Sequence, residues 1–147
     1  MSNYTKILLA TDFSEISAQT VEKAREVALA FKSELCLLHV VEPLPFVDSG
    51  YGEGLPFDIN LTEQMLKAAQ TRLETLAESL NVSKANQWVE IGSPKAEIVR
   101  IASEQEIDLI VIGTHGRHGI GLLLGSTAAS VIHHASCDVL TVRLKDA

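Results

Sequence analysis

Short apolar runs alternate along the chain with longer stretches that have helical periodicity. The runs are rich in leucine and β-branched residues and are bounded by acids, glycines or prolines, as strands are. Between them, apolar side chains recur every three or four residues, the spacing of an amphipathic helix. The predicted strands cover residues 6–11, 34–41, 86–91, 109–113 and 138–143, and the predicted helices cover residues 14–32, 61–80, 94–102 and 126–135.

Strands that alternate with helices predict a parallel sheet. Each right-handed crossover carries a helix over one face of such a sheet. The run at residues 109–113 has no polar alternation, which is typical of a strand buried on both faces. We therefore expect one α/β domain over residues 1–147, an open parallel five-stranded sheet with helices on both faces.

Two helix starts carry recognisable signals. Asp12 or Ser14 is a candidate cap for the first helix. Ser93 is a candidate cap for the third helix, and Pro94 follows it at the position where a helix favours proline. Both starts directly follow a predicted strand and its turn.

Residues 43–60 break the regular pattern. They contain prolines, glycines and aromatic residues without periodicity, so we expect a long irregular connection, either a variable surface loop or a binding lid. The second helix is expected to begin after it, with Asn60 as its cap and Glu63 three residues further on.

Composition and charge argue against some classes of binding partner. The formal net charge is −7 and no basic tract stands out, which argues against a nucleic acid or an anionic membrane as partner. No apolar run approaches the length of a membrane span, and the first residues lack the pattern of a signal peptide. Cys36 and Cys137 lie in or beside predicted strands, so we expect reduced core thiols and a cytoplasmic protein.

The chemistry is expected in the stretch 108–127, where a buried strand leads into a glycine-rich turn and then a helix. Glycines let backbone N–H groups approach an anion closely. The helix start adds unpaired donors and the positive end of its dipole, and the hydroxyls of Ser126 and Thr127 can cap it or meet a phosphate. The glycines of this stretch are Gly113, Gly116, Gly119, Gly121 and Gly125.

Other nucleotide and catalytic motifs fit poorly. A dinucleotide fingerprint should follow the first strand, but that strand ends in Ala-Thr-Asp-Phe-Ser without glycine. A Walker motif, the acid cluster of a receiver domain and a nucleophile-elbow serine do not occur. His133, His134 and Cys137 do not have the spacing of a zinc site.

The remaining pattern is G-x-x-G, eight residues, then G-S. With KILLATDFS at residues 6–14, GSPKAEIVRIASEQEIDLIVIGTHGR at residues 92–117 and LLLGSTAASVIHHASCDVLTVR at residues 122–143, it resembles the universal stress protein family. The resemblance covers essentially the whole chain. It implies a Rossmann-like fold with strand order 3-2-1-4-5, and a homodimer formed through the last strand, from Asp138 to Arg143.

The ATP-binding branch of that family suggests the site residues. By position in the motifs, the resemblance implies that Ala10, Thr11 and Asp12 contact the adenosine and that Val41 packs on the base. It implies that the loop is lined by Ile112, Gly113 and Gly116. The phosphates would be held by Gly125, Ser126 and Thr127. Asp12 would accept a ribose hydroxyl or help to hold Mg²⁺ against the triphosphate, unless it serves only as a helix cap. Arg117 would neutralise a phosphate or remain a solvated loop cation.

One departure from the family pattern leaves three functions open. The interval from Arg117 to Leu124 is one residue shorter than is usual in the ATP-binding branch. The favoured function is a regulatory module that binds ATP and changes its contacts with an unidentified protein partner. The second is a slow ATPase, for which Asp12 and His115 are the candidate catalytic groups. The third is a dimeric stress-related interaction protein with a vestigial pocket.

Overall fold

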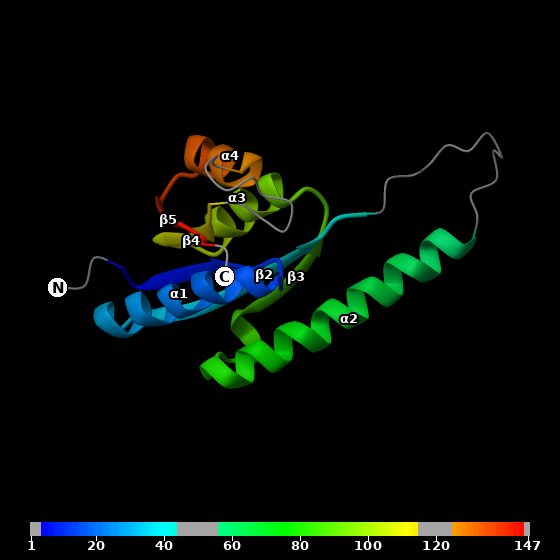
Figure 1. Cartoon of the computed structure of the whole chain (residues 1–147), viewed down its shortest axis with the longest axis horizontal. Helices are drawn as coiled ribbons and strands as arrows, with labels where there is room; N and C mark the ends of the chain where they lie inside the picture. The colour runs from blue at the N-terminus through cyan, green and yellow to red at the C-terminus, as the bar shows by residue number, and fades with distance from the viewer. Residues whose placement is uncertain (1–3, 44–55, 115–124, 146–147) are drawn as a thin grey trace.

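The computed structural model describes residues 4–43, 56–114 and 125–145, with the side chains of residues 56–60 excepted (Figure 1). Within them, five parallel strands form one sheet in the order β3-β2-β1-β4-β5. The strands are β1 (Lys6–Ala10), β2 (Glu34–Val41), β3 (Gln87–Ile91), β4 (Leu109–Gly113) and β5 (Asp138–Val142). The helices are α1 (Ala18–Phe31), α2 (Pro56–Leu80), α3 (Pro94–Glu104) and α4 (Ser126–His134). The predicted α/β fold and its strand order are confirmed.

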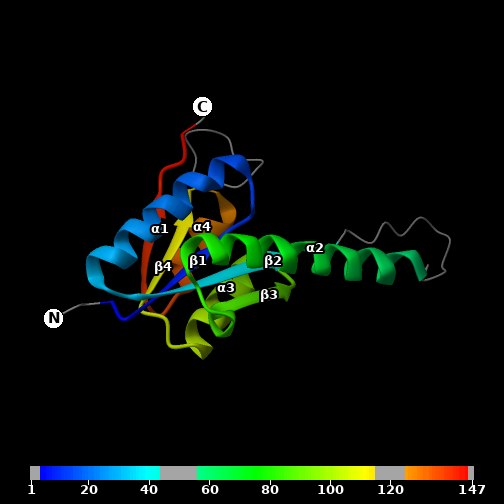
Figure 2. The same cartoon turned by 90° about the horizontal axis from the view of Figure 1, so that it is seen from below.

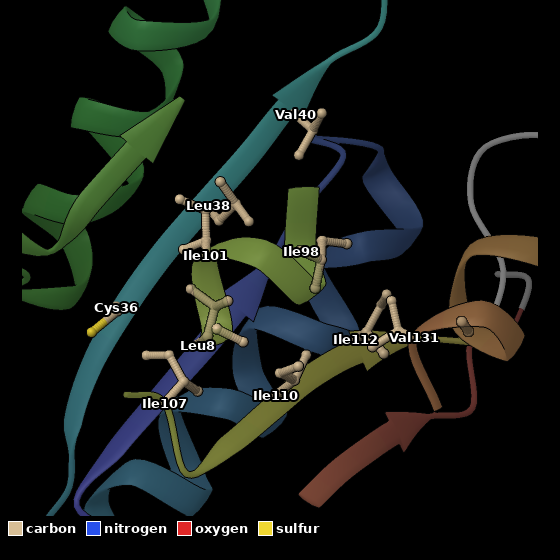
Figure 3. Packing of buried hydrophobic residues seen from close by; sticks show 12 residues of the cluster. Leu8, Cys36, Leu38, Val40, Ile98, Ile101, Ile107, Ile110, Ile112 and Val131 are labelled. Carbon is tan, nitrogen blue, oxygen red and sulfur yellow. The ribbon is translucent and has the colours of Figure 1, made fainter. Parts of the chain in front are cut away.

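The sheet separates two hydrophobic cores. Alternate residues of each strand point to opposite faces, so Leu8 packs toward α3 and α4, whereas Ile7 and Leu9 pack toward α1 and α2. Figure 2 shows α1 and α2 on the same side of the sheet. Figure 3 shows the other core, in which Leu8 and Ile110 lie side by side beneath α3. Both faces are covered, which is why the buried parts of β1, β2 and β4 are apolar.

One helix start, that of α2, and one helix cap, that of α4, differ from the prediction. Helix α2 begins at Pro56, so Asn60 lies inside the helix and the prediction that it caps α2 is wrong. A proline fits the first turn because that turn needs no N–H from it. Residues 44–55 of the predicted connection lie outside the described residues. Helix α4 has Gly125 at its cap position, so Ser126 and Thr127 are its first helical residues and not its cap.

The other two starts lie close to where they were expected. Ser93 occupies the cap position of α3 and Pro94 follows it, but the cap contact comes from the Ser93 carbonyl, which accepts the N–H groups of Ala96 and Glu97 at 3.1 and 2.9 Å. A short 3₁₀ turn, Glu15–Ser17, precedes α1. The sequence signals therefore located these starts to within a turn.

Both cysteines are free thiols, as predicted. Cys36 is fully buried in the core beneath α3, and this burial raises the pKa of its thiol to about 11. Cys137 is half-buried beside the same core, and burial raises its pKa as well. Within the described residues, no helix is both long enough and apolar enough to cross a bilayer.

Candidate functional site

A cavity of about 330 Å³ opens beyond the carboxyl ends of β1, β2 and β4. The register pairs Leu9 of β1 with Leu37 of β2 on one side and with Val111 of β4 on the other. Since the chain winds outward from β1 in one direction and then crosses to β4, the cavity lies where the winding reverses, the usual ligand position in open α/β sheets. Its lining includes these predicted site residues: Ala10, Thr11, Asp12, Ile112, Gly113, Gly125, Ser126 and Thr127.

One wall of the cavity is apolar. Leu38 and Val40 of β2 and Ile112 of β4 supply it from the sheet, and Ile98 of α3 closes it from above (Figure 3). Ala128 of α4 extends the same surface. A wall of this kind can bury the flat face of an aromatic ring.

The polar side of the cavity begins at the turn after β1. The Oδ1 atom of Asp12 accepts the N–H of Ser14 at 2.9 Å and its hydroxyl at 2.7 Å. Among the described residues no donor is bonded to Oδ2, which stays available as an acceptor. Asp12 therefore orders the turn with one oxygen, and it is itself a lining residue of the cavity.

The N-terminus of α4 provides donors at the opposite side. The Gly125 carbonyl accepts the first intrahelical N–H, that of Ala129, at 3.0 Å. The N–H groups at the start of a helix have no partner within it and carry the positive end of its dipole. Ser126 and Thr127 lie at this start and line the cavity. Such an end binds anions.

The two ends of the glycine loop are held together. The Thr114 carbonyl accepts the N–H of Gly125, and the Thr114 N–H donates to the Val142 carbonyl at 2.9 Å. Residues 115–124 between them lie outside the described residues, and so do the predicted site residues His115, Gly116 and Arg117. The loop thus starts and ends at the mouth of the cavity.

Val41 takes a different place from the other predicted residues. It is 4% exposed, and its neighbour Val40 is the residue that lines the described part of the cavity. The carbonyl of Val41 accepts the N–H of Gly92 at 3.0 Å, joining β2 to the turn before α3. A contact between Val41 and a base stays a prediction.

Several lining residues were not predicted as site residues, among them Thr20, His39 and Leu144. Thr20 of α1 and Leu144, which follows β5, meet at Gly113, where an added Cβ would lie 3.0 Å from the Thr20 Oγ1 and 2.7 Å from the Leu144 Cδ1. His39 also lines the cavity, and its Nδ1 lies 2.7 Å from the Thr11 carbonyl oxygen. Leu144 had one signal in the sequence, because it is an apolar residue between Arg143 and Lys145, directly after the last predicted strand.

Replacing Thr20 with valine is expected to stabilise the protein. The Thr20 side chain is 2% exposed, and its Oγ1 has no hydrogen-bond partner among the described residues. A buried hydroxyl without a partner costs free energy that an isosteric methyl group does not. We expect Thr20→Val to raise the free energy of unfolding by about 1 kcal/mol in urea denaturation. A lower stability than that of Thr20→Ser would contradict this.

Comparison with known proteins agrees with this geometry. The family model described as the universal stress protein family matches residues 3–143. Universal stress protein A homolog 2 of Coxiella burnetii is 42% identical over 146 residues, which cover 99% of each chain.

Solved structures share the fold over nearly the whole chain. The structure of MJ0577, a universal stress protein of Methanocaldococcus jannaschii, superposes with a TM-score of 0.81 at 28% identity, covering 98% of this chain and 99% of that one. A universal stress protein solved in complex with cAMP has a TM-score of 0.63 at 25% identity, covering 95% and 96% of the two chains. The chain belongs to the universal stress protein family.

Proposed function

We propose that this protein is a regulatory module that binds ATP in the cavity at the ends of β1, β2 and β4. One observation carries the proposal: an apolar wall, a carboxylate oxygen and a helix N-terminus face a single cavity of about 330 Å³. These three features match the base, the sugar and the phosphates of a nucleotide. A relative solved with cAMP supports a nucleotide as the ligand class.

Each part of the nucleotide has a suitable partner. The base would be buried against Leu38, Val40 and Ile98, and a ribose hydroxyl would donate to the Asp12 Oδ2. The phosphates would accept from the N–H groups at the start of α4, next to Ser126 and Thr127. His115, Gly116 and Arg117 are proposed to complete the phosphate site from the loop.

Mg²⁺ is expected to strengthen ATP binding. Asp12 and Glu42 both line the cavity, so a bare triphosphate meets carboxylates of its own charge. Mg²⁺ commonly bridges phosphates and one or two carboxylates, and it removes this repulsion. We expect the Kd for ATP to rise about tenfold when EDTA replaces Mg²⁺, with the Kd for adenosine unchanged. Equal ATP affinities under both conditions would argue against Asp12 and Glu42 facing the phosphates.

Calorimetric titration of nucleotide-stripped protein tests the proposed function. ATP with Mg²⁺, cAMP and adenosine are titrated separately, and saturable binding of ATP at one site per chain is the expected result. Absence of both heat and thermal shift at millimolar ATP would reject the proposal. The shortened loop interval would then have broken the site, and the vestigial pocket would be the better interpretation.

We further propose that the protein works in the cytosol as a homodimer paired through β5, and that nucleotide occupancy changes its contacts with a protein partner. Strand β5 is at one edge of the sheet, and Val139, Leu140 and Val142 are half-buried there. An exposed strand edge is usually covered or paired. Sedimentation velocity at micromolar concentration should show a dimer, and a monomer alone would reject this pairing.

A further inference from the structure

We infer that Arg72 of α2 is a positioning residue for the nucleotide site, because it holds Phe13 in the backbone conformation that aims the Asp12 carboxylate. The inference rests on the proposed function, since the site that Arg72 would serve is the proposed nucleotide site. Arg72 is not among the lining residues of the cavity, so it acts through Phe13 and not by touching the ligand.

Phe13 has an unusual backbone for its residue type. Its φ is 63°, in the left-handed region that an aromatic residue seldom adopts. It stands between Asp12 and Ser14, the two residues joined by the carboxylate hydrogen bonds of the turn. If Phe13 relaxed to a negative φ, Ser14 would turn away and the Asp12 carboxylate would lose both of its donors. The orientation of Asp12 therefore depends on what keeps Phe13 in place.

Arg72 makes two contacts with Phe13. Its guanidinium carbon lies 4.6 Å from the centroid of the Phe13 ring, a cation–π geometry. One of its terminal nitrogens donates to the Phe13 carbonyl oxygen at 3.0 Å. One contact fixes the ring and the other fixes the peptide group that follows it, so together they constrain the backbone at Phe13. Lysine has no planar fork and would not reproduce the pair.

Other contacts of the turn come from β2, from within the turn, and from the core cluster of α1, α2 and the sheet, against which Phe13 packs. The His39 ring lies 4.3 Å from the Phe13 ring between centroids, and its Nδ1 lies 2.7 Å from the Thr11 carbonyl oxygen. The Phe13 N–H donates to the Thr11 Oγ1 at 3.1 Å. The His39 contacts join the turn to β2, whereas the polar and cation–π contacts of Arg72 join it to α2.

The part of α2 that contains Arg72 is packed against the sheet. Its C-terminal half lies along the sheet, while its N-terminal half extends beyond it (Figures 1 and 2). Leu73, next to Arg72, is 1% exposed and belongs to the core between α2 and the sheet, together with Ala77. The Arg72 guanidinium therefore reaches the turn after β1 from the part of α2 that is packed against the sheet. Movement of α2 would reach Asp12 through this contact.

Arg72→Gln tests the inference, with Arg25→Gln as the matched control. Arg25 is an exposed arginine of α1 whose side chain bonds Glu22 on the same helix. We expect Arg72→Gln to raise the Kd for adenosine about tenfold and the Kd for ATP with Mg²⁺ by at least as much, because both ligands use Asp12. Arg25→Gln should bind both as the parent does. An unchanged Kd in Arg72→Gln would overturn the inference.

A double-mutant cycle separates positioning from a general loss of stability. In an Asp12→Ala background there is no carboxylate to aim, so adding Arg72→Gln should leave the adenosine Kd within about twofold. If the two changes instead multiply, Arg72 acts on the fold at large and the inference is wrong. Adenosine is the useful probe here because it has no phosphate to reach the glycine loop.

A second readout does not depend on ligand. The Ser14 amide donates to Asp12, so its hydrogen exchange reports whether the turn is intact in the free protein. We expect about tenfold faster exchange at Ser14 in Arg72→Gln than in Arg25→Gln. Equal rates would overturn the inference. If the parent binds neither ATP nor adenosine, the proposed function fails, and the exchange rates alone decide whether Arg72 positions Asp12.

Discussion

Replacing Gly113 with valine is expected to lower the affinity for ATP by about 100-fold or more, equivalent to about 2.7 kcal/mol of binding free energy. An added Cβ at this position would lie 2.7 Å from the Leu144 Cδ1 and 3.0 Å from the Thr20 Oγ1. Both neighbours line the cavity, so the valine either fills it or pushes the end of β4 outward. The second movement would displace Thr114, which holds the two ends of the glycine loop together. Calorimetric titration with ATP and Mg²⁺ measures the loss.

The double variant Gly113→Val with Leu144→Ala identifies the cause. Removing most of the Leu144 side chain relieves the shorter contact and leaves the valine in place. Recovery of affinity would show that backbone displacement causes the loss, and continued loss would show that the valine itself occupies the site. ATP binding by Gly113→Val at the parent's affinity would contradict the prediction and place the nucleotide away from the end of β4.

The bounds of strands and helices were predicted best from the sequence where a single physical constraint determined them. The bounds expected for β2 and β4, residues 34–41 and 109–113, are those observed, because strands buried on both faces must be apolar along their length. The start of α2 was missed because the prolines and glycines near Pro56 suggested irregular structure. A proline at the first helical position and a proline in a loop look alike without the following turns packed in place.

The candidate site was predictable where it follows a strand in sequence. Thr11 and Asp12 come directly after β1, and Gly113 closes β4, so the fold class alone brings them to one sheet edge. Thr20 and Leu144 reach the same cavity from a helix and from the residues after β5. In the sequence a threonine near a helix start looks solvated, and only the packing of α1 against β4 buries it.

Side-chain direction was the finest detail that the sequence could not supply. Val40 and Val41 are adjacent apolar residues at the end of β2, and neighbouring side chains of a strand point to opposite faces. Val40 faces the core beneath α3, which continues into the cavity wall. Choosing between two valines requires knowing which face carries the cavity, and that follows from where α3 and α4 pack.

Replacing Ile110 with alanine is expected to cost about 2–5 kcal/mol of unfolding free energy, the range for removing a large aliphatic side chain from a tight core. Ile110 of β4 is fully buried between β1 and β5, where it is paired with Leu8 on one side and Val139 on the other. Two strands and two helices fix its surroundings, so they cannot collapse into the space that the change leaves. Urea denaturation of both proteins measures the difference.

Ile132→Ala is the matched control, because it removes the same atoms from a side chain that is 47% exposed on α4. Its cost should stay within about 0.5 kcal/mol, since water already covers much of that side chain and alanine suits a helix. Similar losses in the two variants would mean that β4 is not buried beneath α3 and α4. The cavity would then lose part of its wall, because Ile112 and Gly113 line it from β4, which lies between β1 and β5. A large loss of unfolding free energy in Ile110→Ala alone would show that the strand that stabilises the core is also the strand that shapes the site, since β4 contains both Ile110 and the lining residues Ile112 and Gly113.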